Sequence, residues 1–95
     1  MAQIDVRATR EDEDGFEFSV SVEEAGSPSA HQVTLSRDDY QRWGSDSPSP
    51  EGFIRRCFEF LLEREPKESI LSRFDVSQIR RYFPEFDEQI GKLQG

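Results

Sequence analysis

Residues 49–64 read SPEGFIRRCFEFLLER, and this run predicts the longest element of the fold. Ser49 is a favourable N-cap and Pro50 suits the first helical position, so a helix should run from here to about Arg64. Its apolar side chains cover roughly 200° of the helical wheel, about twice the arc of an ordinary surface helix; they are Phe53, Ile54, Cys57, Phe58, Phe60, Leu61 and Leu62. The excess predicts that this helix contacts two bodies, either the sheet and a second helix or the sheet and a partner.

Upstream of this helix, apolar and polar residues alternate, which is typical of strands with one buried face. Three such runs are present, at residues 4–9, 16–23 and 31–35. The acidic residues 11–14 followed by Gly15 predict a hairpin turn, and residues 25–29 predict a loop. Because strands joined by short connections usually pair as neighbours, we expect an antiparallel three-stranded meander.

Between the strands and the main helix, Ser36 and Asp39 resemble a capping box, which predicts a short helix to about Trp43 and then a loop. Beyond the main helix, Pro66 should end or kink it, because proline cannot donate the helical hydrogen bond. Pro66 can also start a short helical segment that carries Ile70, Leu71 and Phe74.

Further along, Asp75 and Gln78 resemble another N-cap pair. An apolar stripe with helical spacing then runs straight through Pro84; its members are Ile79, Phe83, Phe86, Ile90 and Leu93. Either one kinked helix or two helices would carry this stripe. Two short helices are favoured, since an interior proline costs about 3 kcal/mol.

These patterns together predict a single α+β domain over residues 1–95, with strands in residues 1–36 and helices in residues 37–95. A chain of this length has room for one hydrophobic core. We expect three to four helices to pack on one face of the three-stranded antiparallel meander.

The charge of the chain limits its partners. Twenty acidic residues oppose twelve Lys and Arg, for a formal net charge of −8, which argues against a generic nucleic-acid binder and against an anionic membrane surface. Residues 1–50 hold eleven acids and four bases, a net −7, whereas residues 51–95 hold nine acids and eight bases, a net −1. Repulsion of nucleic acid is therefore a firm expectation for the strands and a weak one for the helices.

The run FEFLLEREPKESIL at residues 58–71 is followed by Phe74-Asp75, by Ile79 and by YFPE at residues 82–85. This pattern covers roughly the last 40 residues and resembles one found in small uncharacterised prokaryotic proteins. The resemblance implies a bacterial or archaeal cytoplasmic protein, and it brings no activity, cofactor or catalytic residue with it. A cytoplasmic location also fits the single cysteine and the lack of any signal-like or membrane-spanning run.

Residues that could carry chemistry have simpler structural explanations. The acidic residues 11–14 lack the alternating spacing of a calcium loop, so we expect a solvated hairpin tip. His31, the one histidine, is expected to be an exposed polar residue at a strand start, and Cys57 is expected to pack in the core. The sequence therefore predicts no metal site, no cofactor and no enzyme.

The leading hypothesis is a non-enzymatic protein-interaction or regulatory accessory module that binds a protein partner or forms a homodimer. The expected contact residues are Phe60, Arg56, Tyr40 and Trp43. Trp43 fits equally well as a lid on the core.

The alternative is a nucleic-acid-linked, antitoxin-like regulator, with three arginines on the C-terminal helices, Arg73, Arg80 and Arg81. The overall acidity makes this alternative the less favoured one. A small-molecule enzyme ranks third, since it would need a pocket with His31 or a pair of carboxylates.

Overall fold

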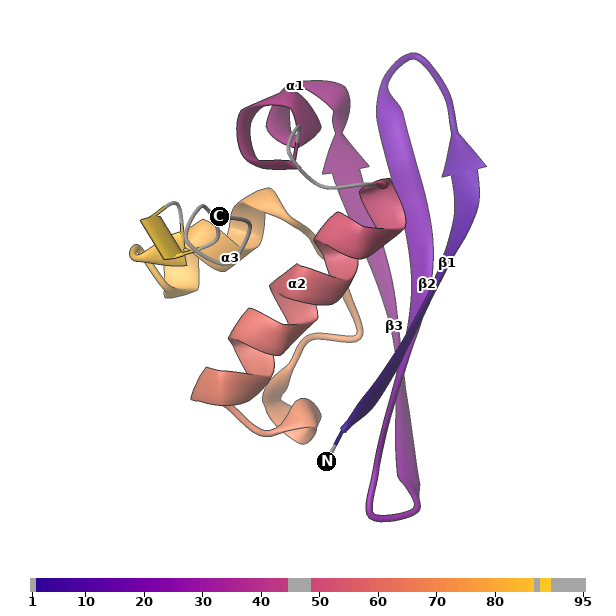
Figure 1. The fold of residues 1–95 in the computed structure, drawn as a ribbon, viewed down its shortest axis with the longest axis vertical. Coiled ribbons are helices and arrows are strands. Elements are labelled where there is room, and N and C mark those ends of the chain that lie inside the picture. The colour runs from indigo at the N-terminus through magenta and orange to yellow at the C-terminus, as the bar shows by residue number, and fades with distance from the viewer. Residues whose placement is uncertain (1, 45–48, 87, 90–95) are drawn as a thin grey trace.

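The structure, a computed structural model, describes residues 2–44, 49–86 and 88–89 (Figure 1). It has an α+β architecture in which the helices lie on one face of a twisted sheet. The strands are β1 (Gln3–Glu11), β2 (Gly15–Glu24), β3 (Ser27–Ser36) and β4 (Arg73–Asp75). The helical elements are α1 (Arg37–Asp39), the π-helical turn η1 (Tyr40–Gly44), α2 (Pro50–Arg64), the 3₁₀ turn η2 (Lys67–Ser69) and α3 (Ser77–Tyr82).

The predicted meander of three antiparallel strands is confirmed. In β1–β2 Ile4 lies opposite Val22, and in β2–β3 Phe18 lies opposite Val33, so that apolar side chains share one face. Phe16, Phe18, Val20 and Val22 of β2 are all buried, while Ser19 and Ser21 between them are exposed. The period-two pattern therefore separates a core face from an open, polar face, as strand geometry requires.

Both ends of β2 depend on residues with positive φ, and the β2–β3 turn is tighter than its composition indicates. Gly15 has φ +151°, and a Cβ there would lie 2.2 Å from the carbonyl oxygen of Leu35, so this position requires glycine. Between β2 and β3 the turn is only Ala25 and Gly26, with φ of 54° and 78°. Positive φ at both central residues suits a two-residue hairpin. Most of the predicted loop at residues 25–29 is therefore strand, and β3 begins at Ser27.

The prediction of three strands is wrong by one, because residues 73–75 form a fourth. β4 pairs in parallel with β3, with Phe74 beside Val33. Only η2 of the predicted helical segment after Pro66 is helical, and Phe74 lies in β4. A strand of three residues is too short to show a period in the sequence. The prediction that residues 37–95 are helical is therefore wrong for residues 73–75.

The predicted starts of α1 and α2 are confirmed, whereas the N-cap of α3 is Val76, without a side-chain cap, although the Asp75 N–H donates to Gln78 Oε1 at 2.9 Å. Ser49 Oγ accepts a hydrogen bond from the Gly52 N–H at 3.0 Å, and Pro50 is the first residue of α2. Ser36 Oγ accepts from the Asp39 N–H at 3.1 Å and begins α1. Among the described residues, no helix is long and apolar enough to cross a membrane.

The wide apolar arc of α2 is buried against two parts of the same chain. One side of α2 packs on the sheet, and on another side the Phe60 ring meets the rings of Phe83 at 5.9 Å and Phe86 at 5.2 Å. α3 ends at Tyr82, Phe83 leaves the helical conformation, and a new helical turn follows in which the Gln89 N–H donates to Glu85 O. The stripe through Pro84 is thus broken into two segments, with Ile90 and Leu93 outside the described residues.

Candidate functional site

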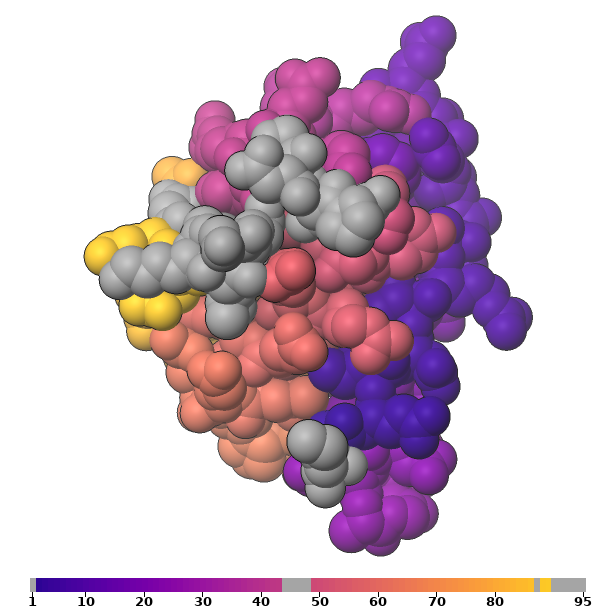
Figure 2. Space-filling view, viewed as in Figure 1, coloured from indigo at the N-terminus to yellow at the C-terminus, as the bar shows by residue number. Residues whose placement is uncertain are grey.

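A groove of about 330 Å³ opens between the C-terminal end of α2, the segment of residues 65–72, β4 and α3. We call it the α2–α3 groove. Its floor is apolar and buried, formed by Leu61, Ile70, Phe74 and Ile79. Its volume lies at the lower end of the range, about 300–1,000 Å³, that is typical of ligand sites. In Figure 2 the indigo and purple atoms of β1 and β2 lie on the right of the molecule, whereas the segments that form this groove, pink to yellow, lie to their left.

The rim of the groove leaves apolar side chains in water. Leu71 is 46% exposed and Tyr82 is 64% exposed, and these are the large hydrophobic residues that the described part of the chain leaves exposed. Both line the α2–α3 groove. Exposed apolar side chains beside a concave apolar floor are typical of binding sites.

His31 holds one rim of the groove in place. Its Nδ1 lies 2.8 Å from the carbonyl oxygen of Leu71, and its Nε2 lies 2.9 Å from Ser29 Oγ. Because a carbonyl oxygen only accepts, we assign the hydrogen to Nδ1, which donates to Leu71. The prediction of an exposed histidine is wrong: His31 is 3% exposed, since residues 65–72 cover it and its ring packs 5.3 Å from that of Phe58.

Lys67 is a second anchor of the same segment. Its side chain is buried, and Nζ donates to Ser27 Oγ at 3.2 Å and to Glu68 Oε2 at 2.6 Å. A third link is the backbone hydrogen bond from the Gln32 N–H to Ser72 O at 2.7 Å. Sequence reasoning missed Lys67, because lysines are almost always exposed and no local pattern marks a buried one. The three anchors give the groove a preformed rim.

Glu65 brings a carboxylate to this apolar groove. Partial desolvation raises the pKa of its side chain above its ordinary value. Within the described residues its carboxylate has no hydrogen bond or ion pair. Arg80 and Arg81 lie on the side of α3 away from the groove, because successive helical residues are 100° apart and Gln78, Ile79, Tyr82 and Phe83 occupy the groove side.

Two of the predicted contact residues are buried. Phe60 is 1% exposed and Trp43 is 7% exposed. The Phe86 ring lies between them, 5.2 Å from that of Phe60 and 5.3 Å from that of Trp43, and the Arg64 guanidinium lies 3.7 Å above the Phe60 ring. Of the two interpretations of Trp43, the structure supports the lid on the core. Side chains so deeply buried cannot form the outer contact that the sequence assigned to them.

The other two predicted contact residues lie elsewhere on the surface. Tyr40 is half-buried in η1, with its ring 5.4 Å from that of Phe16 and 6.3 Å from that of Phe53. Arg56 is a half-buried residue of α2. None of the four predicted contact residues lines the α2–α3 groove. The groove depends on residues brought together from α2, β4 and α3, so no single stretch of sequence indicated it.

The three arginines of the nucleic-acid alternative come from two layers. Arg73 belongs to the open face of the sheet, where it donates to Gln32 Oε1 at 3.1 Å. Arg80 and Arg81 are exposed residues of α3 in the helical layer. The aromatic side chains of the strands, Phe16, Phe18 and Phe74, are all buried. The open face of the described sheet therefore offers no ring on which a base could stack.

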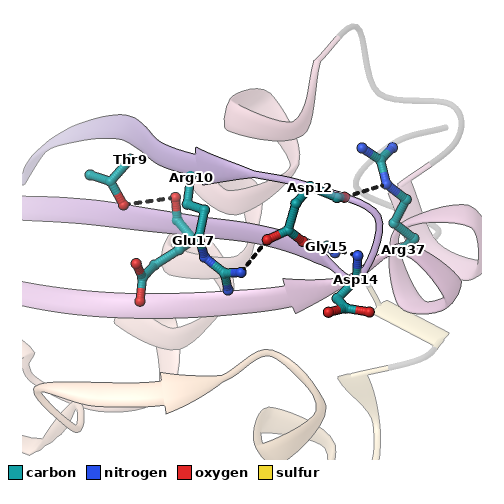
Figure 3. A network of polar contacts seen from close by, with 7 residues as sticks. All are labelled: Thr9, Arg10, Asp12, Asp14, Gly15, Glu17 and Arg37. Atoms are coloured by element: carbon teal, nitrogen blue, oxygen red, sulfur yellow. Dashed lines mark hydrogen bonds and ion pairs between the residues drawn. The ribbon is translucent and has the colours of Figure 1, made fainter.

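The acidic hairpin tip is a hydrogen-bonded turn (Figure 3). The Asp12 carboxylate accepts from the N–H groups of Asp14 and Gly15 at 2.9 and 3.2 Å and forms an ion pair with Arg10. The Asp14 N–H is the main cause that lowers the pKa of Asp12. Arg37 donates to Asp12 O at 2.9 Å. In the described part of the chain no group of three or more His, Cys, Asp or Glu is arranged to hold a metal ion.

The chain matches no protein-family model, no curated protein and no solved structure. The resemblance of its C-terminal run to small prokaryotic proteins therefore stays a prediction. What the α2–α3 groove binds has to be inferred from its own shape and chemistry.

Proposed function

We propose that this protein is a non-enzymatic interaction module that docks a protein partner in the α2–α3 groove. The observation that carries the proposal is the position of Leu71 and Tyr82, which are exposed and flank a buried apolar floor. An apolar side chain of a partner would remove this surface from water, which is worth about 25 cal/mol per Å². A preformed rim lowers the entropic cost of such binding.

The titratable groups near the groove support binding rather than catalysis. Both ring nitrogens of His31 are used in hydrogen bonds that hold the fold. Burial raises the pKa of the Cys57 thiol, which keeps it protonated and unreactive. Of the described residues that line the groove, Glu65 and Tyr82 are titratable, and Ser69 also lines it but has no hydrogen bond to Glu65 that would activate its hydroxyl as a nucleophile.

The groove is small relative to a whole interface. A specific interface buries about 1,200–2,000 Å² in total, and a few anchor residues near its centre supply most of its energy. We therefore assign the groove the role of the anchor pocket, with flatter surface around it completing the contact. In a homodimer, an exposed apolar side chain of the second copy would have to enter each groove. The molecular mass in solution would show whether such a dimer forms.

The test uses the full chain and a phage-displayed library of random dodecamer peptides. Peptides selected on the wild-type protein are then titrated against Leu71→Ser and Tyr82→Ser, which change the two exposed groove residues. The expected result is a loss of at least about tenfold in affinity, because anchor contacts carry most of the binding energy.

The matched control is Ala8→Ser, at an exposed strand position outside the groove, and it should leave the affinity within about twofold. Thermal melts establish that all three variants fold. The proposal fails if no peptide is enriched, or if the enriched peptides bind the groove variants as well as the wild type.

A further inference from the structure

Glu65 is held at the end of the groove by the backbone. It is the C-cap residue of α2, with an extended conformation, and its N–H donates to Leu61 O at 2.9 Å. Both Leu61 and Glu65 line the α2–α3 groove. The backbone that carries this carboxylate is therefore a fixed part of the site.

The cations nearest in sequence are committed elsewhere. Arg64 Nε lies 3.3 Å from a Glu85 carboxylate oxygen, and its guanidinium also stacks on Phe60. Lys67 Nζ is held by Ser27 and Glu68, and Lys67 does not line the groove. Since the arginines of α3 lie away from the groove, the described residues that line it carry a negative charge at neutral pH with no positive one beside it.

The consequence for a docked partner follows from desolvation. A neutral or anionic occupant would cover the Glu65 carboxylate without compensating it, which costs free energy. A cation placed against the carboxylate would offset the solvation free energy that the carboxylate loses when it is covered. The net charge of −8 would also attract a cationic partner to the protein.

We infer that the α2–α3 groove selects a partner segment in which an apolar anchor is accompanied by one Lys or Arg that pairs with Glu65. The inference rests on the proposed docking function and specifies the chemistry of the partner. The apolar anchor lies on the floor formed by Leu61, Ile70, Phe74 and Ile79, between the rim residues Leu71 and Tyr82. Charge at Glu65 then decides between partners of equal hydrophobicity.

The first experiment uses three small probes with the same alkyl chain, n-hexylammonium, n-hexanol and n-hexanoate. Each is titrated into the ¹⁵N-labelled full chain at pH 7, and the amide shifts of Glu65, Leu71 and Tyr82 are followed. We expect hexylammonium to bind about two- to fivefold more tightly than hexanol, the range that a partly exposed ion pair provides. Hexanoate should bind most weakly, and added salt should reduce only the advantage of hexylammonium.

The decisive variant is Glu65→Gln, which keeps the shape of the side chain and removes its charge. It should bind hexanol unchanged and lose the preference for hexylammonium. Glu59→Gln is the matched control, because Glu59 is an exposed carboxylate of the same helix outside the groove, and it should keep the preference.

The second experiment repeats the peptide selection on wild type and on Glu65→Gln. Lys and Arg should be enriched beside an apolar residue in the first selection and lose that enrichment in the second. Groove-dependent peptides without this charge preference would overturn the inference and leave the docking function intact. If no peptide depends on Leu71 or Tyr82, the docking function itself fails. If hexylammonium shows the charge preference but no groove-dependent peptide is selected, the inferred partner segment is wrong and the groove binds a small amine instead.

Discussion

The outer side of α2 is closed at Phe60 and open beside Leu61 and Glu65. Phe83 and Phe86 cover Phe60 from the C-terminal part of the chain, and Trp43 packs on Phe86. At the α2–α3 groove no such cover is present in the described residues, so the rim stays exposed. A wide apolar arc therefore does not by itself locate an interface, because the chain can cover part of the arc with its own aromatic rings.

The charges differ between the two regions in the same way. On the closed side Arg64 pairs with Glu85 and stacks on Phe60, so the carboxylate there is compensated. On the open side the Glu65 carboxylate is partly desolvated without compensation. The closed side thus stabilises the fold, and the open side leaves apolar surface and a carboxylate that the proposed docking function would use.

The largest effect should come from emptying the closed side. Phe60→Ala removes a buried ring that touches two others, and we expect it to cost about 3–5 kcal/mol of the free energy of unfolding, measured by urea denaturation. Tyr82→Ala, on the open side, should change that free energy by less than about 0.5 kcal/mol. Similar losses of unfolding free energy for both variants would contradict the distinction between the covered side at Phe60 and the exposed groove rim at Tyr82.

An intermediate effect is expected where the groove is attached to the sheet. His31→Phe keeps an aromatic ring near Phe58 but leaves the Leu71 carbonyl and the Ser29 hydroxyl without their partner. The expected cost is about 1–3 kcal/mol, since two part-buried polar groups lose their hydrogen bonds.

Amide hydrogen exchange should show where the His31→Phe variant opens. Protection of the Gln32 N–H, which donates to Ser72 O, should fall more than protection within β1–β2. Ser29→Ala, which removes only one of the two histidine contacts, should have the smaller effect. Uniform loss of protection across the sheet would argue against a local anchoring role.

The smallest effects concern the pH dependence of the two carboxylates. Desolvation raises the pKa of Glu65 above its ordinary value of 4.5, so the folded protein binds this proton more tightly than the unfolded chain. Stability from this group therefore falls as the pH rises through 4.5 and above. Glu65→Gln should raise the melting temperature slightly at pH 7, and the gain should disappear below about pH 4.

Glu85 should show the opposite sign. A hydrogen bond from its own backbone N–H, with help from Arg64, lowers its pKa below 4.5. Its stabilising contribution is present above pH 4.5 and is lost as the pH falls through the lowered pKa. Glu85→Gln should therefore slightly lower the melting temperature at pH 7 and have no effect at low pH. Thermal melts between pH 3 and pH 7 measure both changes in melting temperature. If both variants shift the melting temperature in the same direction at pH 7, the proposed electrostatic difference between the two regions is wrong.

The correct parts of the sequence interpretation rest on local patterns. Alternation placed β1 and β2, and the Ser36 and Ser49 caps marked the starts of α1 and α2. Pro84 marked the break after α3. In each case the signal is a property of a few neighbouring residues, which follow directly from backbone geometry.

The errors concern residues whose environment is supplied from far along the chain. His31 is buried because Leu71, forty residues away, accepts its hydrogen bond. Lys67 is buried against Ser27 for the same kind of reason. β4 exists because three residues pair with β3 in parallel, and so short a run has no period of its own.

By itself, the sequence determined the class of fold, the meander, the start of α2 and the excess of apolar surface on that helix, because these depend on propensity and periodicity. Only the tertiary structure decided how that excess is used: Phe60 is covered by the chain itself, and Leu61 with Glu65 lines an open groove. Burial depends on contacts between segments that are distant in the sequence. Neighbouring residues of one helix can therefore be covered by different parts of the fold although their sequence pattern is the same.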